Sequence, residues 1–182
     1  MVLVFLANGF EEIEALATVD ILRRAGLETV TVGVGARRIT GSHGIAVEAD
    51  RDDNEPLPTA KEGLQAVVLP GGLPGTENLR AAASVNAYLA RAEQDGVLLC
   101  AICAAPSVLG RLGYLQGRKA TCYPGYENDL LGAVCEDTGV AVAEDRITAR
   151  GAGVTIPFAL AIVSRLVSPE KAAQLGEAMQ CR

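Results

Sequence analysis

Cys103 is the residue whose position most strongly indicates chemistry. It follows the apolar run Val97–Ile102 and precedes two small residues, Ala104 and Ala105, and then Pro106. This order predicts a strand-to-helix turn, in which small neighbours, here Ala101 and Ala105, let the strand and the helix approach closely. Unpaired N–H groups at a helix start favour negative charge, so we expect a lowered thiol pKa and a nucleophilic Cys103. The alternative, a small buried apolar residue, stays open at this stage.

Cys100 lies three residues before Cys103 and completes a Cys-x-x-Cys motif. A redox-active pair of this kind belongs in the first turn of a helix. Cys100 instead falls within the predicted strand, where residues three apart point to opposite faces of the sheet. We therefore expect Cys100 to pack in the core, and we reject a thioredoxin-like activity.

Glu14 is the acid that we expect to be buried after the first apolar run. A helical wheel gives the predicted helix an apolar arc made of Ile13, Leu16, Ala17 and Ile21. Glu14 lies at the border of this arc, whereas Glu11 and Glu12 point away from it. Burial favours the neutral form of a carboxyl group, which can donate a hydrogen bond to a thiolate. The alternative is a half-buried structural acid.

Gly71 and Gly72 follow another buried run, Ala66–Leu69, after a single proline. Glycines at this point let the backbone approach a ligand closely and present N–H groups at the carboxyl edge of a sheet. The N–H of Gly72 could form an oxyanion hole with that of Ala104. The sequence lacks both phosphate-binding patterns, G-x-x-x-x-G-K-[ST] and G-x-G-x-x-G, and an ordinary tight turn remains an alternative.

The segments that must position these residues alternate between strand-like and helix-like patterns, which is typical of a parallel sheet covered by helices on both faces. The predicted strands are Val2–Leu6, Glu28–Val34, Ala66–Leu69, Val97–Ile102 and Lys119–Thr121. The predicted helices are Glu11–Ala25, Ala83–Ala92, Ala105–Arg111, Pro157–Val167 and Pro169–Gln180. Hairpins are predicted at Ile39–Glu48 and Ala141–Ala149, and a surface connection at Asp50–Lys61. We expect one doubly wound α/β domain over residues 1–182, with ligands beyond the carboxyl ends of the strands.

Composition excludes several classes of function. The chain has 16 Lys and Arg against 22 Asp and Glu, a formal net charge of −6, which provides no attraction for nucleic acid or an anionic membrane. The first apolar run is too short to cross a bilayer and lacks the basic region of a signal peptide. Five scattered cysteines and a single histidine, His43, argue against a disulfide framework and a zinc site. We expect a cytoplasmic protein without metal or cofactor.

Together these segments resemble the ThiJ/PfpI superfamily, and within it the DJ-one (parkinsonism-associated deglycase) group and its bacterial, YajL-like branch. The resemblance extends over nearly the whole chain and rests on residues 8–14, 19–26, 68–72, 101–106 and 158–163. It implies a flavodoxin-like sandwich, usually a homodimer. It also implies that Glu14 reaches Cys103 and that the N–H groups of Gly72 and Ala104 face the sulfur.

The resemblance implies several activities: cofactor-independent glyoxalase III-like or deglycase chemistry on a small aldehyde or glycated substrate, a chaperone, or an oxidative-stress sensor whose cysteine becomes a sulfinic acid. For the enzyme we expect the Cys103 thiolate to add to an aldehyde carbonyl, giving a hemithioacetal. The backbone donors of Gly72 and Ala104 would hold its oxygen, and Glu14 would move the proton that follows.

Two positions depart from the family pattern. Where some members place a histidine near the cysteine, this chain has Tyr123, which disfavours a Cys–His amidase or peptidase. Where the family places a partner-subunit arginine, this chain has His43. That residue could bind an anion when protonated, or it could be a solvated turn residue. Other residues expected near the pocket are Leu73, Arg24, Gly153 and Val154.

Overall fold

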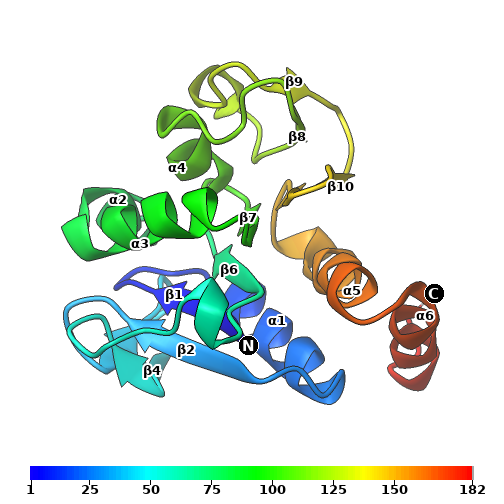
Figure 1. Ribbon diagram of the computed structural model, residues 1–182, viewed down its shortest axis with the longest axis horizontal. Coiled ribbons are helices and arrows are strands. Elements are labelled where there is room, and N and C mark those ends of the chain that lie inside the picture. The colour runs from blue at the N-terminus through cyan, green and yellow to red at the C-terminus, as the bar shows by residue number, and fades with distance from the viewer. Residues whose placement is uncertain (182) are drawn as a thin grey trace.

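A seven-stranded sheet forms the centre of the computed structural model, which describes residues 1–181 (Figure 1). Its strand order is β10-β11-β7-β6-β1-β2-β5, and every neighbouring pair is parallel except β10 with β11. The strands are β1 (Val2–Leu6), β2 (Thr29–Gly33), β5 (Arg51–Asp52), β6 (Ala66–Leu69), β7 (Leu98–Ile102), β10 (Val140–Val142) and β11 (Arg146–Ala149). Two small ladders are separate from this sheet: β3 (Arg38–Thr40) with β4 (Ala46–Glu48), and β8 (Lys119–Ala120) with β9 (Val134–Cys135).

Helices cover both faces of the sheet. On one face lie α1 (Glu12–Arg24) and α5 (Thr155–Leu166), with α6 (Pro169–Ala178) packed against α5. On the other face lie α2 (Gly75–Ala81), α3 (Ala83–Gln94) and α4 (Pro106–Arg111). Short 3₁₀ turns are η1 (Ala60–Glu62), η2 (Glu127–Asp129) and η3 (Ala152–Val154). The chain is thus a single α/β domain with a mostly parallel sheet between two helical layers, as predicted.

The residues of β1 show why an apolar cluster lies on each face of the sheet. All five are buried. Val2, Val4 and Leu6 pack in the cluster that contains α1 and α5, whereas Leu3 and Phe5 pack in the cluster that contains α2, α3 and α4. Successive side chains of a strand point to opposite faces, so an uninterrupted apolar run indicates a strand that is covered on both sides.

The strand order reverses its direction at β1, which makes the carboxyl end of this strand a topological switch point. β2 pairs with one edge of β1 and β6 with the other, so the connections that leave β1 and β6 diverge, as they do where such folds bind ligands. α1 begins after β1, Gly71 and Gly72 follow β6, and Cys103 follows β7. All three motifs therefore lie at the same edge of the sheet.

Most predicted elements are confirmed with small differences at their ends, and both predicted hairpins form. Three predictions need correction. The connection at Asp50–Lys61 contains β5, which extends the sheet beside β2, and also part of η1. The strand at Lys119–Thr121 pairs with β9 outside the main sheet. The sequence-based prediction lacks α2, because seven residues give less than two turns of helical periodicity.

α1 buries a different face from the one predicted. Its buried residues are Glu12, Glu14, Ala15, Thr18, Val19, Ile21 and Leu22. Ile13 and Leu16, which were expected in the core, are 57% and 36% exposed, and Glu12 is buried rather than solvated. A helical wheel ranks side chains by polarity alone. It therefore misses the hydrogen-bond donors, among them Ser42 and His43, that offset the cost of burying the Glu12 carboxylate.

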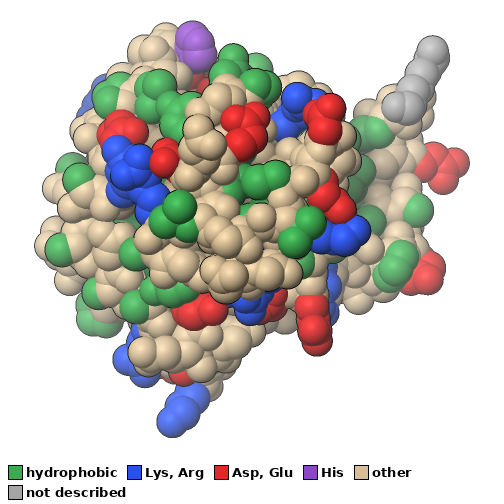
Figure 2. Space-filling view, turned by 90° about the horizontal axis from the view of Figure 1, so that it is seen from above, with side chains coloured by type: hydrophobic (Ala, Val, Ile, Leu, Met, Phe, Trp, Pro, Cys, Tyr) green, Lys and Arg blue, Asp and Glu red, His purple; other side chains and the backbone are tan. Residues whose placement is uncertain are grey.

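The surface carries charges of both signs. On the face shown in Figure 2, acidic and basic side chains are interspersed with apolar ones. None of the helices within residues 1–181 has the length and apolar character needed to cross a bilayer.

Candidate active site

Cys103 occupies the turn between β7 and α4 with a φ of +64°. This left-handed conformation is costly for any residue with a side chain and requires support from its surroundings. The Cys103 N–H donates to the Ala149 carbonyl of β11 (2.8 Å), and the Cys103 carbonyl accepts from the Tyr123 N–H (2.8 Å). These two bonds hold the strained turn, and its half-buried thiol lies at the carboxyl edge of the sheet.

Glu14 reaches the same point from α1. Its side chain is buried, its Oε2 accepts from the Gly71 N–H (2.8 Å), and the carboxyl group lies close enough to the Cys103 thiol for each to shift the pKa of the other. Oε1 is buried and has no hydrogen-bond partner among residues 1–181. A Cβ at Gly71 would lie 2.6 Å from the Cys103 Cβ and 2.8 Å from Glu14 Oε2. The two side chains therefore meet over Gly71, a role that sequence reasoning missed.

Two backbone groups complete the surroundings of the sulfur. The N–H groups of Gly72 and Ala104 lie near the Cys103 thiol, and both favour its charged form. Gly72 has a φ of +90°, and a Cβ there would lie 2.4 Å from the Glu11 nitrogen, so this position requires glycine. The structure thus brings together Cys103, Glu14, Gly72 and Ala104, which come from three different strand ends.

The environment of Glu14 suits proton transfer. Burial raises the pKa of its carboxyl group to about 7, and the negative charge of Glu11 adds to this effect. The hydrogen bond from Gly71 and the neighbouring Cys103 thiol act in the opposite direction. Near neutral pH the carboxyl group is therefore divided between its charged and neutral forms, and it can accept and return a proton.

The expected lowering of the Cys103 pKa is wrong for the resting site. Burial raises the pKa of the thiol to about 12, and the neighbouring Glu14 carboxyl group acts in the same direction. The N–H groups of Ala104 and Gly72 oppose these effects without overcoming them. The physical reason is that burial disfavours the charged thiolate more strongly than the two N–H groups favour it. Cys103 and Glu14 are close enough to titrate as a pair.

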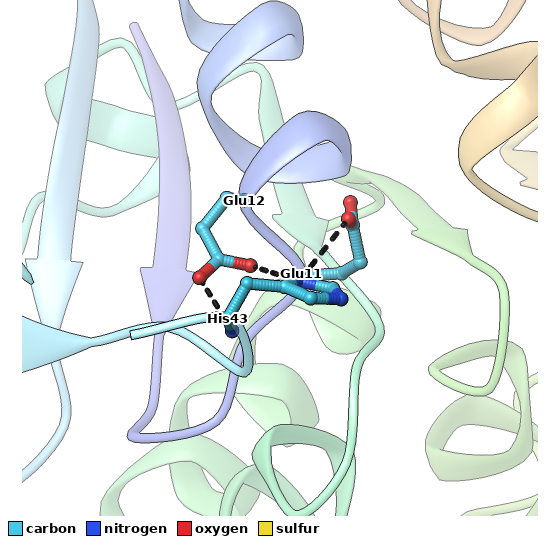
Figure 3. Close-up of side chains that lie close together, drawn as sticks. All are labelled: Glu11, Glu12 and His43. Carbon is cyan, nitrogen blue, oxygen red and sulfur yellow. Dashed lines mark hydrogen bonds and ion pairs between the residues drawn. The ribbon is translucent and has the colours of Figure 1, made fainter. Parts of the chain in front are cut away.

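His43 lies in the turn of the β3–β4 hairpin and faces the first turn of α1 (Figure 3). Its Nδ1 is 2.8 Å from Glu12 Oε2 and 4.0 Å from Glu11 Oε1. Glu12 also accepts from the His43 N–H (2.7 Å) and the Ser42 hydroxyl (3.3 Å). Burial opposes ionisation of Glu12, but these hydrogen bonds lower its pKa to about 2, and Glu12 raises the pKa of His43. Glu12 therefore anchors the hairpin, which no local sequence pattern indicates.

Glu11, Glu12 and His43 also bring potential metal-ligand atoms within 4.8 Å of one another. Histidine number and cysteine spacing, on which a zinc site was excluded, do not indicate this group. Both oxygens of Glu12 and Oε2 of Glu11 already accept hydrogen bonds from the protein. A metal ion would have to displace these donors, and we assign none.

The other expected pocket residues are placed less closely. Leu73 directly follows Gly72 and is 54% exposed, and Tyr123 is 51% exposed. The Tyr123 ring lies over Gly151, where a Cβ would be 3.5 Å from it. Gly153 and Val154 form η3 in the loop after β11, the strand that pairs with β7. These residues follow the carboxyl ends of the strands, as Cys103 does.

Arg24 does not belong to this site. It lies in the last turn of α1, where it forms an ion pair with Asp20 (2.6 Å), and it lines a hollow with Ile156 and Met179. Ten residues of helix separate it from Glu14, which is about 15 Å along the axis. The helix therefore carries Arg24 away from the carboxyl edge of the sheet.

Comparison with known proteins agrees with this geometry. The model of the DJ-1/PfpI family matches residues 1–165. The chain is 34% identical to protein dj-1beta of Drosophila melanogaster, over 97% of this chain and 95% of that protein. It is 32% identical to deglycase PH1704 of Pyrococcus horikoshii, over 79% of this chain and 84% of that protein. It is also 34% identical to protein DJ-1 homolog A of Arabidopsis thaliana over its full length, but spans only 46% of that longer protein.

Solved structures show the same fold. The DJ-1 superfamily protein STM1931 from Salmonella typhimurium superposes with a TM-score of 0.90 at 35% identity, over 98% of this chain and 97% of that one. Oxidized DJ-1 from Toxoplasma gondii superposes with a TM-score of 0.89 at 34% identity, over 98% and 97% of the two chains. Assignment to the YajL-like branch stays a prediction.

Proposed function

The chain belongs to the DJ-1/PfpI family, and from this starting point we propose that it processes reactive carbonyl compounds through Cys103. The observation that carries the proposal is the contact of one strained cysteine with a buried acid and two backbone N–H donors. A relative that shares 32% of its residues is named a deglycase. The substrate class is a small α-oxoaldehyde such as methylglyoxal, or its adduct with an amine.

The first step follows from the protonation states of the pair. The Cys103 thiol has a raised pKa, whereas burial brings the pKa of Glu14 to about 7. Glu14 in its carboxylate form accepts the thiol proton as the sulfur forms a bond to the aldehyde carbon. The electron pair of the C=O bond moves to oxygen. The N–H groups of Gly72 and Ala104, which face the sulfur beforehand, then stabilise the developing oxyanion.

The later steps use the same two side chains. The oxyanion takes up a proton to give a hemithioacetal, and Glu14, again as carboxylate, removes the proton from the former aldehyde carbon. The hydroxyl proton moves to the former ketone oxygen, and return of the carbon-bound proton to the adjacent carbon then gives a thioester of lactate on Cys103. Water then hydrolyses the thioester, which releases lactate and restores the thiol. The net reaction is methylglyoxal plus water to lactate, without a redox cofactor.

Lactate release from methylglyoxal by the purified protein tests this proposal. We expect Cys103→Ala to reduce lactate formation to the uncatalysed rate, because Cys103 is the thiol that lies beside Glu14 and forms the thioester in this mechanism. Cys135→Ala is the matched control, since Cys135 is an exposed free cysteine on a different strand. Lactate formation by Cys103→Ala at the rate of the parent protein would refute the mechanism.

A second function is an oxidative-stress sensor or chaperone that uses Cys103 without turnover. A relative whose structure was determined in an oxidized state favours this alternative. Two equivalents of peroxide each transfer one oxygen to the sulfur and leave as water, which gives a sulfinic acid and a mass increase of about 32 Da. Stoichiometric oxidation of Cys103 in a protein that makes no lactate would support the sensor over the enzyme.

An amidase or peptidase is less well supported. His43 is the sole histidine of the chain, and its Nδ1 is bound to Glu12. Tyr123 takes the family position where a histidine could relay a proton to a leaving amine, and its backbone contacts Cys103.

We also propose that the protein acts as a cytoplasmic homodimer. Ile13, Leu16 and Ile45 are 57%, 36% and 53% exposed, and the Ile45 N–H lies against Glu12, next to Ile13. Neighbouring exposed apolar side chains of this kind are typical of subunit interfaces. The five free cysteines suit a reducing compartment.

A further inference from the structure

Glu11 forms hydrogen bonds with Glu14, the acid beside Cys103, and with Gly71, the glycine over which Glu14 and Cys103 meet. It is the N-cap of α1, and its Oε2 accepts a hydrogen bond from the Glu14 N–H (2.7 Å). Its own N–H donates to the carbonyl of Gly71 (2.9 Å). Gly71 in turn donates its N–H to the Glu14 carboxyl group. The cap, the glycine and the acid thus form one connected set of hydrogen bonds.

The same carboxylate acts electrostatically on Glu14. The titratable side chains that influence Glu14 are Cys103, from the β7 turn, and Glu11, from its own helix. Those that face Glu11 across the hairpin are His43, at 4.0 Å, and the adjacent Glu12, which is paired with His43. Because the capping bond fixes the Glu11 side chain, its charge keeps a constant position relative to the Glu14 carboxyl group.

We propose that Glu11 is a positioning residue for Glu14: its carboxylate fixes the first turn of α1 and holds a permanent negative charge beside the Glu14 carboxyl group. The inference rests on the proposed function, in which Glu14 moves protons. A like charge nearby disfavours ionisation of Glu14. Glu11 therefore adds to the effect of burial in determining the pH range over which Glu14 can accept the thiol proton.

The test measures alkylation of Cys103 by iodoacetamide as a function of pH, followed by mass spectrometry of the peptide that contains Cys103. This readout needs no carbonyl turnover, so it can succeed or fail independently of the proposed function. Glu14 as carboxylate assists departure of the thiol proton, so the parent rate should rise through an inflection near neutral pH. A parent profile without this inflection would overturn the inference.

Glu11→Gln removes the charge but keeps an oxygen that can cap Glu14. We expect the inflection to move to lower pH by roughly half a unit, so that alkylation at pH 6, relative to the plateau, becomes about two- to threefold faster. A profile that superimposes on that of the parent would overturn the inference. Glu170→Gln is the matched control, because Glu170 is an exposed acid in the first turn of α6. An equal shift in this control would show an effect of net charge only and would also overturn it.

Glu11→Ala separates position from charge. This variant loses the cap as well as the charge, so we expect the acid shift together with a lower plateau rate and a lower melting temperature. An unchanged plateau would show that the cap does not position Glu14. If Glu11→Gln shifts the profile but the parent protein makes no lactate, the positioning role stands and the carbonyl chemistry fails.

Discussion

Glu14 makes the folded protein less stable when it is charged than when it is neutral. Burial raises its pKa from 4.5 to about 7, so the folded state binds this proton more tightly than the unfolded chain does. Stability should therefore fall as pH rises from about 4.5 to 7, by at most about 3 kcal/mol. We expect Glu14→Gln to remove this loss and to be more stable than the parent at pH 8, while losing carbonyl turnover. Urea unfolding at pH 5 and pH 8 measures the difference, with exposed Glu28→Gln as control.

Gly71→Ala should damage the site through sterics alone. The new Cβ would lie 2.6 Å from the Cys103 Cβ and 2.8 Å from Glu14 Oε2, closer than atoms in contact allow. We expect a stability loss of about 2 kcal/mol and a large loss of turnover, because one of the two side chains must move. Gly176→Ala is the control, since Gly176 lies in α6 and a Cβ there would make only an ordinary contact, 3.5 Å from Leu160 Cδ1. Equal turnover by these two variants would contradict the arrangement described for Gly71.

At the scale of single residues, the sequence identifies Cys103 from a turn of small residues and Glu14 from the border of an apolar helix face, because both are local patterns. It gives the wrong pKa for Cys103, since burial by distant segments cannot be read from neighbouring residues. Glu12 is missed for the same reason. Its hydrogen-bond donors lie about thirty residues away in the chain.

The β3–β4 hairpin is an element whose attachment depends on one carboxylate. Glu12 accepts hydrogen bonds from three residues of the turn region, Ser42, His43 and Ile45. We expect Glu12→Ala to destabilise the protein by about 2 kcal/mol, because several hydrogen bonds to this buried carboxylate are lost, and to speed amide hydrogen exchange at Ile45. Glu48→Ala, an exposed acid of the same hairpin, should leave exchange at Ile45 unchanged. Similar exchange in both variants would refute the anchoring role.

The contact between the β3–β4 hairpin and α1 should depend on pH, because both Glu12 and His43 titrate. Hydrogen bonds lower the pKa of Glu12 to about 2, so its contribution is present above about pH 4.5 and disappears as pH falls towards 2. The raised pKa of His43 adds stability that is present in acid and is lost as the pH rises above its folded-state value. The hairpin should therefore be held most firmly between these limits.

Elements are predicted well where the sheet is covered on both faces. They are predicted poorly where part of a helix face is exposed in the single chain. β1, β6 and β7 are covered on both faces, and their continuous apolar runs give their positions well. The orientation of α1 is predicted wrongly, because Ile13 and Leu16 look like core residues in a wheel. Their exposure in the single chain is explained if they face a second copy, which a wheel cannot distinguish from a core.

The proposed homodimer leads to a prediction for the whole molecule. We expect Leu16→Asp to halve the particle mass, from about twice the 18.9 kDa of the chain to that of one chain, because a charge at a packed interface is costly. Leu131→Asp is the control, since Leu131 is equally apolar and 53% exposed but lies near η2. Light scattering after size-exclusion chromatography gives the masses. A parent protein with the mass of one chain would refute the dimer.

The anion-stabilising donors around Cys103 are peptide groups, and this has a consequence for protein engineering. No codon change at position 72 or 104 deletes an amide hydrogen unless it introduces proline, which would also deform the turn. Ordinary mutagenesis therefore retains this part of the chemistry whenever the loops keep their shape. Replacing a single amide with an ester by chemical ligation would remove one donor and leave every side chain in place.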